Sequence, residues 1–453
     1  MKNRFLIIFF GIISNCVFSQ TWHSVGNGIG KFGYIECLRE INDTLYLGGV
    51  IEKDSNAIGN GIIRFDGLHL DSLGCGPNGR VDNIETFIDG KIYIVGPFIR
   101  ICNDINYGYI AKWNGIEWEQ FTGAIPVTSN IGVVKFFNNQ LYFGGDFFNV
   151  NGISVNRIAS WDGTSWHDVG GGIWDPMPCF ITDMAVYKGK LIVVGNFIKA
   201  GSINANYIAS WDGTKWDSLG GGLNDNPTCL CVDTTHDLLY VGGYFTQADT
   251  LSAHGLAMWD GTNWSVPFRQ CITPYPKSIS IFNNKLYVGG EATSNPPSAQ
   301  DTIFSCWDGT KWKKIIGPNG DINALSVYKS NLYVGGQFSN ISGDTAIKYI
   351  ACYGNSCPLN VGLNEVKKDQ TEYLWQNIPN PFSSTTSIPY FVPKGNIGSI
   401  QIVDATGNLM KIYKLSEGKN NLDISLAQLN PGIYYYSIFI NGIKKQTLKM
   451  MVN

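Results

Sequence analysis

The chain has 453 residues, of which 44% are hydrophobic and only 15% are charged, and its formal net charge is −3. Its 53 glycines and its 13% of aromatic residues favour short strands and tight turns over helices. No block of one charge sign is present, which argues against electrostatic capture of nucleic acid or of an anionic membrane. A chain of this length predicts about two to three domains.

The N-terminus has the pattern of a secretory signal peptide over residues 1–19. Lys2 and Arg4 form a positive start, and Phe5 to Ile13 form an apolar run too short to span a bilayer. Small residues up to Ser19 precede the expected cleavage site, which leaves Gln20 as the first residue. A short buried strand is the alternative interpretation. We find no other segment apolar and long enough for a membrane helix, so we expect none in the mature chain.

The cysteines are compatible with an oxidising compartment. The sequence has 11, and removal of Cys16 with the signal peptide leaves an even number, which permits disulfides. Cys352 and Cys357 flank a turn and are placed to bridge it, whereas Cys229 and Cys231 are too close along a strand to pair with each other. The spacing has no zinc pattern. We therefore expect loop disulfides or buried thiols, and no cofactor.

An internal repeat dominates the sequence up to residue 362. An apolar run ending in glycine begins at seven positions that lie 46 to 50 residues apart, and an aromatic residue follows each start after 20 or 21 residues. The runs begin at Leu45, Ile92, Leu141, Leu191, Leu239, Leu286 and Leu332. The aromatic residues are Phe65, Trp113, Trp161, Trp211, Trp259, Trp307 and Tyr353, and four of them open the motif WDGTxW.

Each repeat contains four strand-like runs, which in the fourth repeat are residues 181–187, 191–197, 207–211 and 215–219. The dipeptide Asp212-Gly213 predicts a type I′ hairpin turn between the last two. Four strands in a repeat of this length are typical of a propeller blade, so the sequence predicts an all-β fold with a seven-bladed β-propeller over residues 20–362. The alternative is a solenoid or a string of small sandwiches.

The first repeat is preceded by a short run, Trp22 to Gly26, that matches the fourth strand of later repeats. We predict that it closes the ring by pairing with the third run of the last repeat, around Tyr349 to Tyr353. The fourth run of that last repeat, near residues 357–361, contains Pro358, which a paired central strand tolerates poorly. The pattern resembles kelch-like β-propeller repeats but differs from them in WDGTxW, so no kelch function is implied.

The composition changes after residue 362. Residues 363–373 are charged and polar and predict a linker. Beyond it come QNIPNPF at residues 376–382, IVDATGN at 402–408 and LNPGIYYY at 429–436, in runs that predict a small antiparallel β-sandwich.

These motifs, with KMMV at residues 449–452, resemble the type A C-terminal sorting domain of the type IX secretion system of Bacteroidetes, over residues 374–453. The resemblance implies recognition by the type IX secretion machinery, and a protein that is secreted or anchored at the outer cell surface after passing the periplasm. The residues expected to form the sorting motif are Asn377, Pro379, Asn380, Pro381, Phe382, Asp404, Gly407, Gly432, Tyr434 and Lys449.

The sequence offers no catalytic, cofactor-binding or metal-binding set. None of the five histidines lies in HExxH, and no GxSxG motif is present. The aspartate of each WDG is best explained by turn geometry. Asp175, Asp225 and Asp321 precede first strands and can gather at one face, but their spacing is not that of a calcium loop.

Two functions therefore remain open for the propeller. One is a non-enzymatic module that binds an unidentified protein or glycan through loops, with Trp174 and Tyr275 as contacts. The alternative is a glycan-acting hydrolase with loop carboxylates at the propeller funnel, which requires two carboxylates about 5 to 10 Å apart in one pocket.

Overall fold

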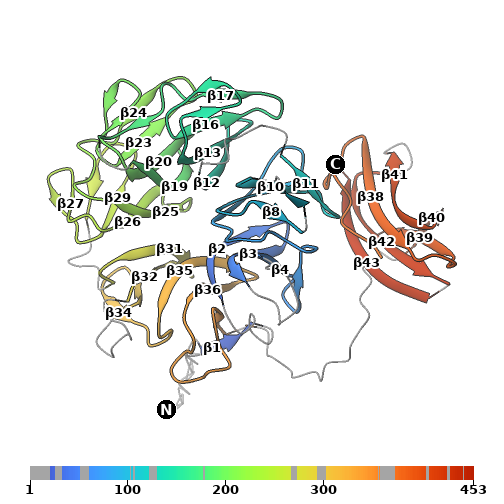
Figure 1. Cartoon of the computed structure of the whole chain (residues 1–453). Helices are drawn as coiled ribbons and strands as arrows, with labels where there is room; N and C mark the ends of the chain where they lie inside the picture. Colours follow the sequence, from blue (N-terminus) through green and yellow to red (C-terminus); the bar gives the residue numbers. More distant parts are fainter. Residues whose placement is uncertain are drawn as a thin grey trace, which may run out of the picture.

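The computed structural model describes residues 21–25, 33–51, 61–102, 104–105, 108–121, 130–176, 179–266, 273–292, 302–355, 357, 373–404, 408–425, 429–441 and 443–452. Every regular element among them is a β-strand, so the predicted all-β class is confirmed (Figure 1). In these ranges we find no helix with the length and apolarity needed to cross a membrane. The expected signal peptide, Pro358 and nearly all of the expected linker lie outside the described residues.

Residues 21–354 hold seven four-stranded antiparallel sheets in the described part of the chain, here called repeat sheets 1 to 7. Sheets 1 to 3 consist of β2 (Gly33–Ile41), β3 (Thr44–Ile51), β4 (Ile62–Phe65) and β5 (Leu70–Ser72); β6 (Asn83–Thr86), β7 (Ile92–Val95), β10 (Ile110–Trp113) and β11 (Trp118–Gln120); and β12 (Asn130–Phe137), β13 (Gln140–Asp146), β16 (Ile158–Trp161) and β17 (Trp166–Asp168).

Sheets 4 to 6 follow the same order. They consist of β19 (Phe180–Tyr187), β20 (Lys190–Asn196), β23 (Ile208–Trp211) and β24 (Trp216–Ser218); β25 (Pro227–Asp233), β26 (Leu238–Gly243), β29 (Leu256–Trp259) and β30 (Trp264–Ser265); and β31 (Pro276–Phe282), β32 (Lys285–Gly290), β33 (Phe304–Trp307) and β34 (Trp312–Lys314).

Sheet 7 joins the two ends of the repeat region. It contains β35 (Asp321–Tyr328), β36 (Asn331–Gln337) and β37 (Ile350–Gly354), and β1 (Thr21–Ser24) is its fourth strand. Trp22 lies opposite Tyr353 in the β1–β37 register, so the predicted closure by the N-terminal run is confirmed (Figure 1).

The repeat sheets are arranged in a β-propeller-like ring. The first strand of each sheet contacts the first strand of the next, and β35 of sheet 7 contacts β2 of sheet 1. Glycines make this approach possible: a Cβ on Gly144 of sheet 3 would lie 2.7 Å from the side chain of Met184 in sheet 4. Further out, tryptophans fill the space between sheets, and the Trp216 indole Nε1–H donates to the Val169 carbonyl, which follows sheet 3.

The turns within the repeat sheets are of two kinds. Between β19 and β20, Lys188 and Gly189 both have positive φ, as a two-residue type I′ turn requires. The type I′ turn predicted at Asp212-Gly213 is wrong. Trp211 pairs with Trp216, which leaves a four-residue loop, and in Asp212-Gly213 only the glycine has positive φ. The Asp212 carboxylate instead accepts the Thr214 and Lys215 amides, so the side chain holds the turn.

Small hairpins extend the connections between second and third strands. They are β8 (Arg100–Ile101) with β9 (Asp104–Ile105), β14 (Asn149–Val150) with β15 (Ile153–Ser154), β21 (Lys199–Ala200) with β22 (Ile203–Asn204), and β27 (Gln247–Ala248) with β28 (Leu251–Ser252). A further strand, β18 (Ile173–Trp174), pairs with β21. These hairpins lie at the end of the ring where the first strands begin.

Two disulfides are present among the described cysteines. The predicted Cys352–Cys357 bridge is confirmed. A second bridge, Cys75–Cys102, was not predicted and ties the segment after β5 to the β8 hairpin. Cys229 and Cys231 carry free thiols, as expected.

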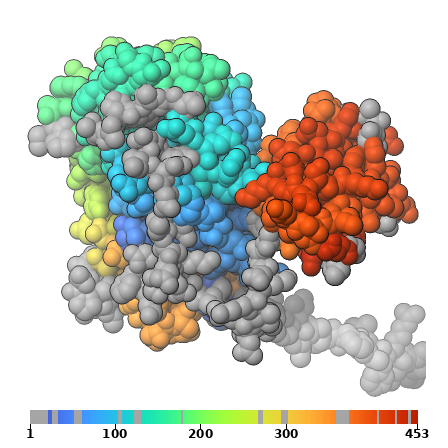
Figure 2. Space-filling view, turned by 45° about the vertical axis from the view of Figure 1, so that its right-hand side comes forward, coloured from blue at the N-terminus to red at the C-terminus, as the bar shows by residue number. Residues whose placement is uncertain are grey.

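The C-terminal residues, orange to red in Figure 2, form two further sheets around one core. One pairs β38 (Thr385–Val392) with β41 (Gly418–Ser425); the other is ordered β40 (Leu409–Leu415), β39 (Gly398–Asp404), β42 (Gly432–Ile440) and β43 (Ile443–Val452). Apolar residues from both sheets, including Ile388 and Tyr436, are buried together.

Candidate functional site

A cavity of about 680 Å³ lies at the axis of the ring. All seven first strands contribute residues to its wall. Because the wall is made of the innermost strands alone, its chemistry is set by the alternate residues of those strands that face the axis.

A β-bulge recurs in the first strands and places an extra residue at this wall. The register shifts once in six of the seven, for example between Ile181 and Asp183 in β19. The bulged residues are Glu36, Gly132, Thr182, Thr228, Lys277 and Asn323. Five of these six are polar. The repeat spacing did not indicate these bulges, although a polar residue at the same place in successive repeats is a signal for them.

Four of the six bulged residues, namely Thr182, Thr228, Lys277 and Asn323, bond to the next sheet around the ring. Thr182 Oγ1 donates to the Pro227 carbonyl at 2.7 Å, and Lys277 Nζ lies 2.8 Å from an Asp321 carboxylate oxygen. Asn323 Nδ2 donates to the Ile35 carbonyl at 3.1 Å, which connects sheet 7 to sheet 1. The polar lining therefore holds neighbouring sheets in register.

Glu85 is the most buried charge in the channel, with 4% of its surface exposed. Arg39 Nη2 donates to its two oxygens at 2.8 and 3.0 Å, and Lys135 Nζ lies 2.9 Å away. Burial by itself raises the pKa of Glu85, but Lys135 and Arg39 outweigh it, so the pKa is lowered. This cluster joins sheets 1, 2 and 3 through one ionised carboxylate.

Asp183 has no such cations at hydrogen-bond distance. Its carboxylate accepts two hydrogen bonds from backbone amides. One comes from Leu230 in the next sheet at 2.8 Å, and the other from the adjacent Met184 at 2.7 Å. Enclosure in the channel raises the pKa of Asp183 to about 6, against the opposing effect of these amides and of Lys135 and Arg39. Burial also raises the pKa of Glu36. Among the residues that line the channel, the pKa of Glu85 is thus lowered, whereas the pKa values of Asp183 and Glu36 are raised.

A pair of tyrosines lies near the end of the channel where the first strands begin, here called the rim. Tyr275 directly precedes β31 and Tyr244 directly follows β26; their rings are 5.2 Å apart. Both are partly exposed, at 41% and 37%. Tyr244 OH donates to Glu291 Oε2 at 2.8 Å, and burial together with this carboxylate raises the pKa of Tyr244 to about 12. The pair is held in place and open to solvent.

The other residues singled out from the sequence are dispersed. Trp174 is 45% exposed, with Lys199 Nζ 5.4 Å from its ring centroid. Asp321 is ion-paired with Lys277 and accepts the Ala292 amide. The described residues contain no group of three or more His, Cys, Asp or Glu side chains placed to hold a metal ion.

In the C-terminal sheets, the opening of the expected sorting motif is built into the core. Asn377 is 1% exposed. Its backbone N–H donates to Tyr436 OH, and its side-chain nitrogen donates to Thr386 Oγ1 and to the Pro379 carbonyl. The peptide bonds before Pro379 and Pro381 are cis.

The remaining motif residues lie around the ends of β39, β42 and β43. Phe382 is buried, and Asn380 Oδ1 accepts the Met451 amide. Asp404 pairs in register with Tyr434, and Asp404 Oδ1 accepts the Asn408 amide. Gly432 begins β42, and the Lys449 carbonyl accepts the side-chain nitrogens of Asn380 and of Gln376. Gly407 lies outside the described residues.

The geometry defines an all-β chain with a β-propeller-like ring and a separate two-sheet C-terminal domain. Residues 377–453 match the family model of the secretion system C-terminal sorting domain. These residues are a sorting domain of the type IX secretion system, and the protein is exported through the periplasm to the cell surface or secreted.

Several solved structures match the chain at low sequence identity. A protein described as the extracellular domain of a one-component system from B. thetaiotaomicron is 13% identical, with a TM-score of 0.45, and covers 94% of this chain and 58% of its own. PorZ, a surface component of the type IX secretion system of Porphyromonas gingivalis, is 11% identical, with a TM-score of 0.37 and coverages of 92% and 65%. The chain thus spans less than two thirds of either protein.

A fungal alcohol oxidase of the AA5 family is 12% identical, with a TM-score of 0.43 and coverages of 96% and 99%. No curated protein matches the sequence. Similarities at these levels carry no inference about ligand or activity.

Proposed function

We propose that residues 20–362 form a seven-bladed β-propeller, exported from a Bacteroidetes bacterium after removal of a signal peptide at residues 1–19. In this proposal residues 363–373 are a linker and residues 374–453 are the whole sorting domain. The cyclic order of contacts between the first strands and the β1–β37 pairing support it. Limited proteolysis tests it, since cleavage within residues 363–373 is expected to release two stable fragments.

We propose that the propeller is a non-enzymatic module that binds a protein or glycan ligand at the rim. The observation that carries this is the ordered, exposed pair of Tyr244 and Tyr275. Partly exposed aromatic residues with a fixed polar group are common in ligand sites, because they provide contact area with little loss of side-chain freedom.

The channel carboxylates favour binding over catalysis. Glu85 has both oxygens engaged by cations, and Asp183 has both oxygens engaged by backbone amides. A carboxylate that holds two sheets together in this way is not free to attack a substrate or to activate a water molecule.

A glycan-acting hydrolase is the second candidate, and one observation favours it. Asp183, with a raised pKa, and Glu85, with a lowered pKa, face the same channel, and such a difference separates an acid from a base in glycosidases. Release of reducing ends from a panel of bacterial and plant polysaccharides tests this candidate. If it is correct, the wild type is active and Asp183→Asn is not.

The binding proposal is tested with a glycan array and a pull-down from cell-surface extracts, using the full mature chain. Tyr275→Ala is expected to reduce the captured signal at least tenfold, since an aromatic residue at a binding hot spot contributes about 2 kcal/mol or more. Tyr435→Ala is the matched control, because Tyr435 in the sorting domain is similarly exposed at 39%. Equal capture by wild type and Tyr275→Ala would contradict a site at the rim.

We also propose that the sorting-motif residues given above act together in export. Asn377 and Asn380 fasten the opening segment to β42 and β43, and Asp404 and Tyr434 pair beside them. Asn377, Phe382 and Tyr434 are buried, so they would act by holding the exposed part of the motif in a fixed shape for the secretion machinery. Secretion of variants, measured as the ratio of protein in the medium to protein in the periplasm, tests each residue.

A further inference from the structure

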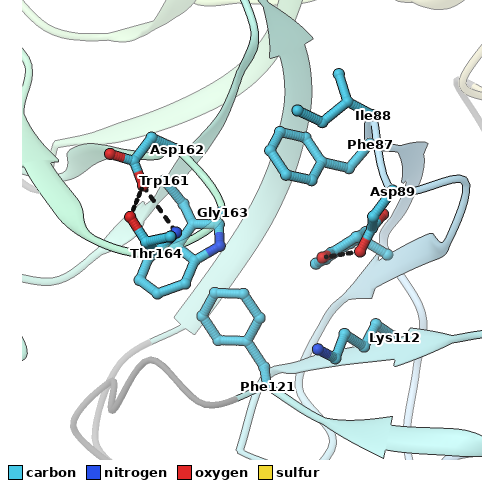
Figure 3. Close-up of a pocket in the computed structure, with 10 residues that line it drawn as sticks. Phe87, Ile88, Asp89, Lys112, Phe121, Trp161, Asp162, Gly163 and Thr164 are labelled. Carbon is cyan, nitrogen blue, oxygen red and sulfur yellow. Dashed lines mark hydrogen bonds between the residues drawn. The ribbon is translucent and has the colours of Figure 1, made fainter.

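A second cavity, of about 390 Å³, lies between repeat sheets 2 and 3 (Figure 3). It is formed by the β6–β7 turn of sheet 2 and by the β16–β17 turn of sheet 3. Both turns lie at the end of the ring opposite the rim, because the first strands begin at the rim and end at these turns. Phe87, Tyr93, Phe121 and Trp161 provide its aromatic lining.

At another sheet interface, two side chains cross the corresponding gap. Between sheets 4 and 5, Tyr187 OH donates to the Asp237 carbonyl at 2.8 Å, and Lys188 Nζ donates to the Asp260 carbonyl at 2.6 Å. The lysine stem also packs over the glycine of the next WDG turn, Gly261. A hydroxyl and an ammonium group thus clamp one sheet to the next.

The same clamp recurs between sheets 7 and 1. There, Tyr328 OH donates to the Asp43 carbonyl at 2.9 Å, and Lys329 Nζ donates to the Asp66 carbonyl at 2.5 Å. Two interfaces on different sides of the ring therefore use the same pair of residue types in the same turn.

Sheet 2 lacks this clamp, as do sheets 1, 3, 5 and 6, whose turns have no tyrosine–lysine pair. Phe87 and Ile88 stand where the tyrosine and the lysine stand in sheets 4 and 7, and neither has a polar group that can reach the next sheet. The turn of sheet 2 is also one residue longer: the Phe87 amide donates to the Lys91 carbonyl across three intervening residues. Ile88 is 65% exposed, and the cavity lies beside this longer turn.

Polar groups fixed by their neighbours surround the aromatic lining. Asp89 accepts Tyr93 OH at 3.0 Å and the Lys91 amide at 3.1 Å. Asp162 accepts the Thr164 amide and hydroxyl through one oxygen, and hydrogen bonds from His167 and Thr164 lower its pKa. Figure 3 shows Asp89 and the Lys112 ammonium on one side of the cavity, facing Trp161 and Thr164 on the other.

We propose that this cavity binds one sugar ring, a pyranose at the end of a glycan. A pyranose has C–H faces that pack against aromatic rings and a rim of hydroxyls that both donate and accept. Its hydroxyls would donate to Asp89 and accept from Lys112, whose Nζ also lies 3.3 Å from Glu119 Oε2. An apolar ligand would remove water from these charged groups without replacing its hydrogen bonds, and an anion would meet the carboxylates of Asp89 and Asp162.

The cavity is large enough for a sugar ring. Its 390 Å³ lies near the lower end of the range of about 300–1,000 Å³ for small-molecule sites. The carboxylates are already oriented by hydrogen bonds, so little side-chain freedom is lost on binding.

Saturation-transfer NMR on the full mature chain tests the proposal. The probes are the methyl pyranosides of glucose, galactose, mannose and N-acetylglucosamine, with N-acetyltyrosinamide as an aromatic peptide probe. At least one pyranoside is expected to receive saturation. Failure of all four, or saturation of N-acetyltyrosinamide alone, overturns the proposal.

Lys112→Met is the diagnostic variant. Methionine already occupies the matching position in sheet 5, because Met258 lies opposite Tyr240 as Lys112 lies opposite Tyr93, so the fold accommodates it. The dissociation constant is expected to rise roughly tenfold or more, the effect of losing a hydrogen bond to a charged group. Unchanged affinity overturns the proposal.

Two further variants separate this site from the rim and from general effects on the fold. Phe87→Trp fills the cavity and is expected to abolish saturation, whereas Lys190→Met, which removes a surface ion pair with Asp217 in sheet 4, leaves it unchanged. Tyr275→Ala is also expected to leave it unchanged. If Tyr275→Ala abolishes the pyranoside signal, the sugar binds at the rim and the cavity proposal falls.

Discussion

Asp183 offers a test of how the channel is held together. Its pKa rises from an ordinary value of 3.8 to about 6 in the folded chain, because enclosure disfavours the charged form. A difference of about two pKa units corresponds to roughly 3 kcal/mol. The folded chain binds this proton more tightly than the unfolded chain, so the contribution is favourable at low pH and is lost as the pH rises from about 4 to about 6.

Asp183→Asn removes this titration. The substitution also changes the hydrogen bonds that residue 183 accepts from the backbone amides of Met184 and Leu230. This effect does not depend on pH, so it cancels when the free energy of unfolding is compared across pH values. From pH 4 to pH 7, the variant is therefore expected to gain roughly 2.5 kcal/mol relative to the wild type. Urea unfolding at pH 4, 5, 6 and 7 measures this difference.

Asp212→Asn provides the control for this series. Hydrogen bonds from Thr214 and Lys215 lower the pKa of Asp212 to about 2, so the wild type loses its contribution only as the pH falls below about 4. The free energy of unfolding of Asp212→Asn is expected to change with pH in parallel with that of the wild type from pH 4 to pH 7. If the free energy of Asp183→Asn also runs parallel to that of the wild type, the pKa of Asp183 is not raised in the folded chain.

Three further changes test the packing between sheets, a disulfide and the sorting domain. Trp216→Phe removes a buried indole hydrogen bond and is expected to lower the free energy of unfolding by about 1–2 kcal/mol more than Trp166→Phe, whose indole nitrogen has no partner in the described chain; equal losses in denaturant unfolding would contradict this. Replacing Cys352 and Cys357 by alanine opens a short loop and is expected to lower that free energy by roughly 2 kcal/mol; calorimetry of the oxidised and variant chains measures it, and an unchanged melting temperature would count against the bridge. Asn377→Ala removes three hydrogen bonds from its buried side chain, so the sorting domain is expected to lose about 1–3 kcal/mol and secretion to fall; undiminished secretion would show that the side chain is dispensable.

Elements that depend on neighbours along the chain can be predicted from the amino-acid sequence. Apolar runs followed by turn residues place the four strands of the fourth repeat, β19, β20, β23 and β24, to within one or two residues. The N-terminal run was assigned to the last repeat because Trp22 belongs to a fourth-strand motif that lacks a hairpin partner of its own. The sorting domain was recognisable because its motifs occur in a fixed order at the C-terminus.

The contacts between neighbouring sheets become visible in the folded chain alone. The role of the bulged Thr182 and Lys277 depends on the distance to the next first strand, which the repeat period does not contain. The Cys75–Cys102 bridge joins residues from successive repeats. The type I′ turn expected at Asp212 was wrong because the side chain competes for the turn amides.

The two candidate binding sites, the rim and the cavity beside Phe87, also depend on contacts between sheets. The sequence marked Tyr275 as an exposed aromatic residue, but its partner Tyr244 comes from the preceding sheet. The cavity beside Phe87 lies between side chains of sheets 2 and 3, whose separation the repeat pattern does not contain. Local patterns determine strands and turns because those depend on backbone preferences and short-range hydrogen bonds. The space and charge between sheets depend on side chains that meet only after the ring has closed.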